Sequence, residues 1–161
     1  MKKTVHAGEA YGPESIFQAI TDLHAARIGH CYHLFSHELI QDKRIADPKR
    51  YVKELAQYIA DRRITLEVCL TSNLQTMPNL KSLRDHSLRK MLDAKLSISL
   101  CTDNRTISNT TVSRELQLAV ENFDLTPARL RSTVIYGFKR SFFPDGYLHK
   151  RDYVRRIIDF Y

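Results

Sequence analysis

The chain has 161 residues, of which 43% are hydrophobic and 27% are charged, with only five glycines and five prolines. This composition excludes a disordered polypeptide and predicts one folded domain with a substantial core. The formal charge of +7 comes from basic residues spread thinly along the chain, so we expect no nucleic-acid partner.

The hydrophobic pattern alternates between the periods of strands and helices. Short β-like runs at 2–7, 27–35, 64–73 and 96–104 are each followed by a helical pattern, and two further helical segments close the chain. Pro13, Pro48 and Pro127 mark first turns of helices. The expected helices are 12–26, 47–63, 85–95, 110–123, 126–143 and 149–161. Four repeats of strand then helix predict an α/β fold with a parallel sheet.

Successive strand ends lie about 32 residues apart, which fits a (β/α)8 barrel and equally a doubly wound open sheet. The distribution of polar residues favours the barrel, because residues at the carboxyl ends of its strands converge on one mouth. Such residues follow every predicted strand: His6 and Glu9, His30, Thr71–Asn73, and Thr102–Asn104. Four units make half of a barrel.

Two histidines and two carboxylates that converge would suit zinc, which prefers imidazole and carboxylate ligands. Zinc lowers the pKa of a bound water to near neutrality, and a nearby glutamate that is not a ligand can transfer protons. Gly8 permits the turn that would bring Glu9 beside His6.

Each residue taken alone also has an ordinary structural interpretation. Asp103 and Asn104 could cap the helix that follows, and Ser72 and Asn73 could be loop residues. The three cysteines fit small core residues, and five histidines have no partner that the sequence identifies. These histidines are His24, His33, His37, His86 and His149.

Four motifs in order, "VHAGE", "RIGH", "EVCLTSN" and "SLCTDN", resemble the carboxyl-terminal half of the adenosine deaminase family, within the metal-dependent hydrolase superfamily. The resemblance covers residues 1–161. It implies units five to eight of a zinc-dependent (β/α)8 barrel, with terminal helices from about residue 127. The implied reaction is hydrolytic deamination of adenosine or 2'-deoxyadenosine to inosine or deoxyinosine and ammonia, in purine salvage.

The resemblance also implies roles for individual residues. His6 and Asp103 match zinc ligands, and Glu9 matches the proton donor to the purine ring. His30 matches the histidine that orients and helps to deprotonate the attacking water. Asn104 stands where the family most often has a second aspartate, and its amide can donate a hydrogen bond to purine N7.

Other features also depart from the family pattern. The His-x-His pair of the family's amino-terminal half occurs nowhere in this sequence, and Cys31 and Leu70 replace a usual Gly and a common Pro. Catalytic zinc usually has three or more protein ligands, so we expect the chain alone to bind zinc weakly and to be inactive. Activity is expected in a full-length enzyme. The alternatives are an inactive fragment, a half-barrel assembly partner, or a deaminase of another 6-aminopurine compound.

The expected partners are a purine nucleoside and either the missing amino-terminal half or a second copy. A half-barrel would leave open strand edges at 2–7 and 96–101. We also expect it to expose apolar side chains that fill a barrel interior, namely Val5, Ile28, Val68 and Ile98.

The expected location is the cytoplasm, with no membrane attachment. No apolar run approaches the ~20 residues of a membrane span, and the first ten residues lack the apolar stretch of a secretory signal. Cys31, Cys69 and Cys101 are odd in number and contain no Cys-x-x-Cys pair, which is typical of a reducing compartment.

Overall fold

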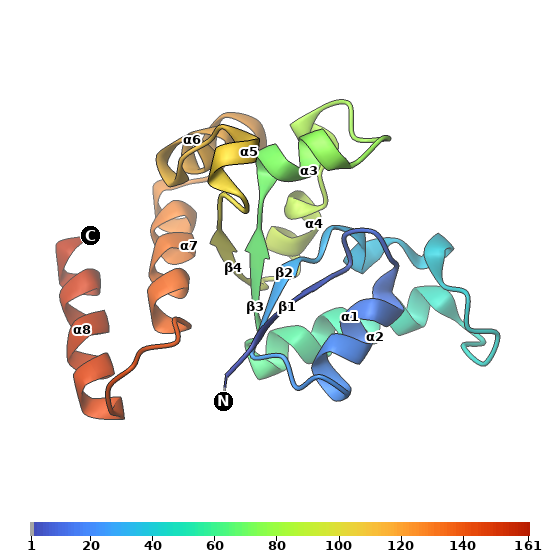
Figure 1. Ribbon diagram of the computed structural model, residues 1–161, viewed down its shortest axis with the longest axis horizontal. Helices are drawn as coiled ribbons and strands as arrows, with labels where there is room; N and C mark the ends of the chain where they lie inside the picture. Colours follow the sequence, from blue (N-terminus) through green and yellow to red (C-terminus); the bar gives the residue numbers. More distant parts are fainter. Residues whose placement is uncertain (1) are drawn as a thin grey trace.

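Four short parallel strands form one sheet in the computed structural model, which describes residues 2–161 (Figure 1). They are β1 (Thr4–Ala7), β2 (Arg27–His30), β3 (Thr65–Val68) and β4 (Ser97–Leu100), arranged in the order β1-β2-β3-β4. Every neighbouring pair is parallel. Parallel strands in sequential order are the arrangement of consecutive units of a barrel, so the predicted partial barrel is confirmed.

The helices lie between and after the strands. The three predicted first-turn prolines begin their helices, and the side chains of Asp47 and Thr126 cap two of them by accepting hydrogen bonds from Arg50 N and Arg129 N. The helices are α1 (Pro13–Thr21), α2 (Pro48–Arg62), α3 (Leu70–Thr76), α4 (Leu88–Asp93), α5 (Arg105–Ser108), α6 (Val112–Phe123), α7 (Pro127–Lys139) and α8 (Tyr147–Phe160), with 3-10 turns η1 (Tyr32–Phe35), η2 (His37–Leu39) and η3 (Leu83–Asp85).

All four strands are shorter than the sequence predicts, and β4 ends at Leu100 where the predicted run continues to residue 104. The second ends at His30, because His30 and Cys31 adopt left-handed backbone conformations with φ of 66° and 55°. The third ends at Val68, and the expected strand residues 71–73 lie in α3 instead. Tertiary hydrogen bonds made by α3 outweigh the β propensity of this segment. Helix α5 has no counterpart among the expected helix ranges, the nearest of which is 110–123.

The two faces of the sheet differ in polarity. Thr65 and Ser97 are paired in register, and a hydrogen bond of 2.9 Å connects their hydroxyl groups. Arg27 forms an ion pair with Glu67 on the same face. The opposite face is apolar. There Ile28, Leu66, Val68 and Ile98 pack in the core with helix residues Ile16, Leu55, Ile59 and Met91.

The expectation that Val5, Ile28, Val68 and Ile98 fill a barrel interior is therefore wrong. Successive residues of a strand point to opposite faces. His6 lies over Gly29 on the polar face, so Val5 must face the helices, against which it is partly buried. The register carries the same alternation through β2, β3 and β4.

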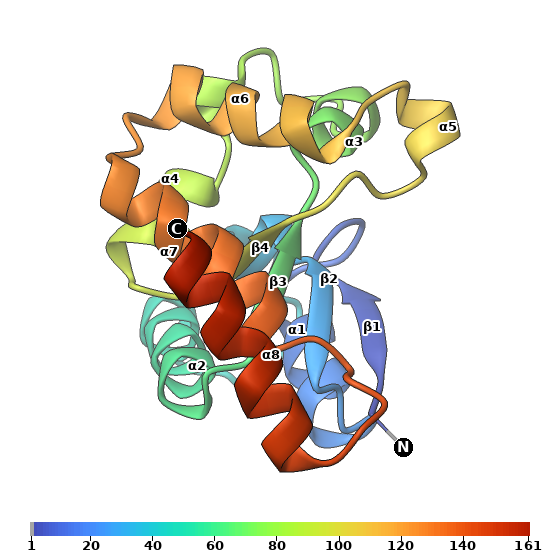
Figure 2. The ribbon, with the colours of Figure 1, turned by 90° about the vertical axis from the view of Figure 1, so that its left-hand side faces the viewer.

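The two outer strands are covered unequally. Helix α7 packs along β4, with Gly137 against the Ser99 hydroxyl, and α8 packs outside α7 (Figure 2). β1 pairs only with β2 among residues 2–161, and Thr4 and His6 are exposed. Of the two open edges that we expected, one is thus covered by a helix. No helix within residues 2–161 has the length and apolarity to cross a membrane.

Candidate active site

Three of the predicted site residues meet at the carboxyl ends of the strands. One candidate ligand atom each from His6, His30 and Asp103 lies within 4.8 Å of the other two. The rings of His6 and His30 have centroids 4.9 Å apart and stand nearly perpendicular, at 84°. The predicted convergence of these residues is therefore present in the structure.

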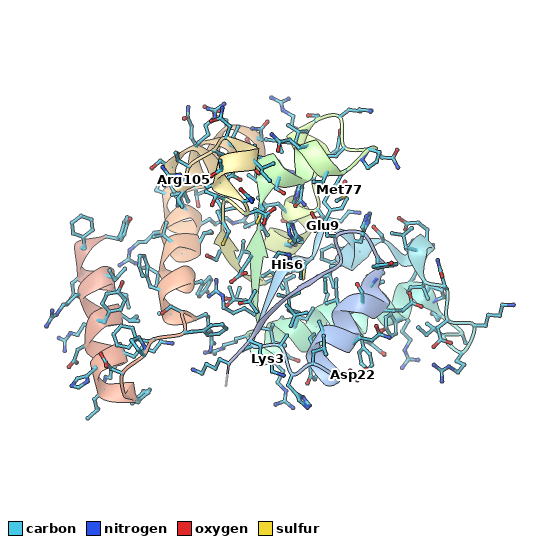
Figure 3. All side chains as sticks on the ribbon, in the orientation of Figure 1. Lys3, His6, Glu9, Asp22, Met77 and Arg105 are labelled. Atoms are coloured by element: carbon cyan, nitrogen blue, oxygen red, sulfur yellow. The ribbon has the colours of Figure 1, made fainter. Side chains whose placement is uncertain are left out.

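Glu9 lies beside this cluster. The chain turns after β1 at Gly8, where φ is 67° and an added Cβ would lie 2.5 Å from Ile16 Cδ1. The turn places Glu9 Oε2 3.3 Å from His30 Nε2, and Thr76 Oγ1 donates to Glu9 Oε1 at 3.4 Å. In the view of Figure 3, Glu9 lies between His6 and Met77, the residue that follows α3. The carboxylate thus reaches the cluster edge, as the turn at Gly8 predicts.

Asp103 and Asn104 follow β4 in a short loop. Asp103 has a left-handed backbone with φ of 54°, and its Oδ2 accepts a hydrogen bond of 2.8 Å from Ser72 Oγ. Asn104 caps α5, because its Oδ1 accepts from Ile107 N at 3.1 Å. An amide whose oxygen serves as a cap keeps its two N–H donors. Capping by Asn104 is therefore compatible with the purine contact that we expect from it.

A buried hydrogen-bonded chain behind His30 was missed by the sequence analysis. Asn73 Nδ2 lies 3.2 Å from His30 Nδ1, and Asn73 Oδ1 lies 3.1 Å from His86 Nε2. The backbone N–H of Leu88 donates to His86 Nδ1 at 2.9 Å. In the sequence, the only sign of these hydrogen bonds was the position of Asn73 in the "EVCLTSN" motif. Nothing in the sequence pointed to His86.

Burial governs the charge of these imidazoles. Desolvation lowers the pKa of His30, although the negative charge of Glu9 opposes the shift. Desolvation also lowers the pKa of His86, to about 4. Burial raises the thiol pKa of Cys31 and Cys69, which agrees with their interpretation as core residues.

Glu115 of α6 holds α3 in place. This carboxylate is fully buried and accepts hydrogen bonds from the N–H of Thr71 at 3.2 Å, from the hydroxyl of Thr71, and from the hydroxyl of Thr110 at 2.8 Å. Because Ser72 and Asn73 follow Thr71 directly, Glu115 also fixes the residues that touch Asp103 and His30. The sequence pattern predicts only that Glu115 lies on a helix.

The donor set of the cluster suits a borderline metal. Two imidazole nitrogens and a carboxylate oxygen are ligands that zinc accepts. His6 and Asp103 are both exposed residues, whereas His30 is buried. A metal ion could therefore approach the first two from solvent.

Residues 1–159 match the adenosine deaminase family. The chain belongs to the adenosine deaminase family. The adenosine deaminase of Photorhabdus laumondii is 38% identical over 142 residues, a match that covers 88% of this chain and 38% of that protein. The matches lie in the carboxyl-terminal part of such relatives, so the sequence-based recognition of the family is confirmed.

Solved structures give the same result. An amidohydrolase from Burkholderia ambifaria with bound Zn superposes with a TM-score of 0.75 at 25% identity, over 99% of this chain and 41% of that one. The N6-mAMP deaminase of Arabidopsis superposes with a TM-score of 0.72 at 28% identity, again over 99% and 41%. The chain therefore spans about two fifths of the length of these barrel enzymes.

Proposed function

We propose that this chain carries the metal-binding and proton-transfer part of a zinc-dependent hydrolytic deaminase that converts adenosine or 2'-deoxyadenosine to inosine or deoxyinosine and ammonia. The observation that carries the proposal is the meeting of His6, His30 and Asp103, with Glu9 Oε2 3.3 Å from His30 Nε2. Membership of the adenosine deaminase family supports deamination as the type of reaction. A cytoplasmic location remains part of the proposal.

Each residue has a defined task in this reaction. His6 and Asp103 would hold zinc, which supplies a water molecule of lowered pKa. Glu9 donates a proton to N1 of the purine, and His30 orients the attacking water. Asn104 donates a hydrogen bond to purine N7, which is an acceptor. General acid catalysis of this kind contributes typically about 10²–10⁴-fold.

The choice of adenosine as the substrate rests on sequence identity. Adenosine is favoured because the curated relatives named adenosine deaminase are 37–38% identical, more than the 28% of the Arabidopsis N6-mAMP deaminase. Deamination of another 6-aminopurine is the alternative, and an inactive half-barrel that serves only in assembly is another. Zinc content and ammonia release distinguish the three.

The test measures bound zinc after dialysis and ammonia release from adenosine, 2'-deoxyadenosine, adenine and N6-methyl-AMP. We expect weak zinc binding and little turnover from this chain alone, because two protein ligands are fewer than the three usual in catalytic sites. Adding the amino-terminal half of the Photorhabdus relative should give turnover of adenosine. Tight stoichiometric zinc and rapid turnover by the chain alone would contradict this account, and no ammonia from any substrate in the mixture would support the inactive alternative.

Glu9→Gln tests the proton-transfer assignment in the same mixture. Turnover should be abolished while zinc is retained, because Glu9 is assigned to proton transfer and not to metal binding. Glu38→Gln is the matched control, since Glu38 is exposed and pairs with His37 at 3.9 Å, outside the cluster. Loss of zinc in the Glu9→Gln protein would instead make Glu9 a ligand.

A further inference from the structure

Asn73 connects two buried histidines. The exposed fractions are 1% for His30, 0% for Asn73 and 2% for His86. The contacts run from Leu88 N to His86 Nδ1, from His86 Nε2 to Asn73 Oδ1, and from Asn73 Nδ2 to His30 Nδ1, at 2.9, 3.1 and 3.2 Å. We call His86, Asn73 and His30 the relay.

The backbone determines the direction of every hydrogen bond in the relay. The N–H of Leu88 can only donate, so His86 Nδ1 must be an acceptor and the hydrogen of the neutral ring must lie on Nε2. That N–H donates to Asn73 Oδ1, which leaves the Asn73 amide N–H to donate to His30 Nδ1. The reverse orientation of the Asn73 amide would place two donors opposite each other at His86.

The same order of donors and acceptors continues to the active site. A neutral His30 that accepts at Nδ1 carries its hydrogen on Nε2, and Nε2 is the atom that lies 3.3 Å from Glu9 Oε2. Burial keeps His86 neutral at physiological pH, since its pKa is lowered to about 4. Each hydrogen bond of the relay therefore keeps the same donor and the same acceptor under the conditions in which the protein would act.

We propose that Asn73 and His86 are positioning residues that lock His30 in the Nε2–H tautomer, so that His30 presents a hydrogen-bond donor to the reaction site. The functional part of this inference rests on the proposed deaminase activity, whereas the tautomer does not.

The relay assigns different tasks to the clustered groups. An imidazole nitrogen that bears a hydrogen has no lone pair for a metal, so the relay excludes His30 from metal binding and leaves His6 and Asp103 as ligands. The relay also changes the role that the family resemblance implies for His30, because an Nε2 that bears a hydrogen cannot accept a proton from water. His30 would orient water by donating to it, and the Asp103 carboxylate would accept the proton, because Glu9 must carry its own proton to act as the donor to purine N1.

The tautomer can be measured directly in this chain. Long-range ¹H–¹⁵N correlation spectra of the ¹⁵N-histidine-labelled protein separate the Nδ1–H and Nε2–H forms, and the His30→Gln and His86→Gln chains assign the signals. We expect the Nε2–H form for both histidines, without metal and after addition of zinc. An Nδ1–H form of His30 in the unsubstituted chain overturns the proposal.

Asn73→Asp tests whether the relay causes the tautomer. A carboxylate accepts from both neighbours, so His30 should change to the Nδ1–H form. Asn79→Asp is the control, because it makes the same chemical change at an exposed position. An unchanged His30 tautomer in a folded Asn73→Asp chain also overturns the proposal.

Kinetics separates this inference from the proposed function. In the protein reconstituted with the amino-terminal half, Asn73→Asp should lower kcat about 10- to 100-fold, in the range of residues that support a metal site, with little change in KM. The Nε2–H tautomer without any deaminase activity would contradict the proposed function alone. A reversed tautomer with unchanged kcat would contradict the role of the relay in catalysis.

Discussion

Ser72 Oγ donates a hydrogen bond of 2.8 Å to Oδ2 of Asp103 and so joins α3 to the loop after β4. Outer hydrogen bonds of this kind fix the orientation of a ligand, and their loss typically lowers metal affinity about 10- to 100-fold. We therefore expect Ser72→Ala to weaken zinc binding by that factor, measured by competition with a chromophoric chelator. Ser113→Ala, at an exposed position of α6, should leave the affinity unchanged. Equal affinity of both variants would mean that Ser72 does not support the site.

Replacing Glu115 should loosen α3. Glu115→Ala leaves the Thr71 N–H and the hydroxyls of Thr71 and Thr110 without their acceptor and creates a buried cavity. We expect the free energy of unfolding to fall by about 2–4 kcal/mol, measured by urea denaturation followed by circular dichroism. Glu121→Ala, on the exposed side of the same helix, should cost less than about 0.5 kcal/mol. Comparable losses in the two variants would show that Glu115 does not anchor α3.

The features that depend on local pattern were predictable from the sequence. Pro13, Pro48 and Pro127 marked helix starts, and hydrophobic periodicity identified the four strands and their parallel arrangement. The rule that strand ends converge in a barrel was sufficient to bring His6, His30 and Asp103 together. These inferences succeed because they need only spacing and residue type.

Other features depend on long-range contacts or unusual backbone angles. Asn73 meets His30 across 43 positions of sequence, and no local pattern predicts that partner. Cys31 has a φ of 55°, a conformation that favours the Gly usual in the family, and Leu70 begins α3, a position that suits Pro. Positions 31 and 70, where this sequence departs from the family pattern, could therefore have indicated the sharp turns after β2 and before α3. The error about the barrel face was avoidable, because His6 on the inner side requires Val5 on the other.

Gly29 leaves room for the His6 ring. A Cβ at position 29 would lie 2.7 Å from His6 Cδ2, so Gly29→Ala must displace the imidazole. We expect zinc affinity to fall about 10-fold in calorimetric titration. Gly146→Ala is the control, because nothing among residues 2–161 lies within 4 Å of a Cβ there. Undiminished affinity of the Gly29→Ala chain would show that the His6 ring need not hold its position to bind metal.

The β1 edge should cause self-association of the isolated chain. β1 is unpaired on its outer side among residues 2–161, with Thr4 and His6 exposed, and such edges recruit other strands. Because α7 covers β4, two copies would have difficulty in closing a pseudo-barrel, so we expect pairing through β1 or larger aggregates. Thr4→Lys should shift light scattering toward monomer, whereas Thr106→Lys in α5 should not. A monodisperse monomer of the unsubstituted chain at micromolar concentration would contradict this prediction.

His86 should make the fold sensitive to acid. Its pKa in the folded chain is about 4, against an ordinary value of 6.5, because burial disfavours the charged ring. A pKa lowered by folding means that the folded state prefers the neutral form. The contribution of His86 to the free energy of unfolding is therefore complete above pH 6.5 and is lost as the pH falls from 6.5 toward 4, by at most about 3 kcal/mol.

His86→Gln isolates this contribution. The variant should be less stable than the unsubstituted chain at pH 7, because it disrupts the relay, but its stability should fall less steeply between pH 6.5 and 4. His30, whose pKa is also lowered by burial, remains in both chains, so the difference between the two slopes is assigned to position 86. Urea denaturation at half-unit intervals of pH measures both slopes, and the exposed His149→Gln should follow the unsubstituted chain. Parallel pH profiles for the His86→Gln and unsubstituted chains would show that His86 ionises as easily in the folded state as in the unfolded one, and that burial does not keep it neutral.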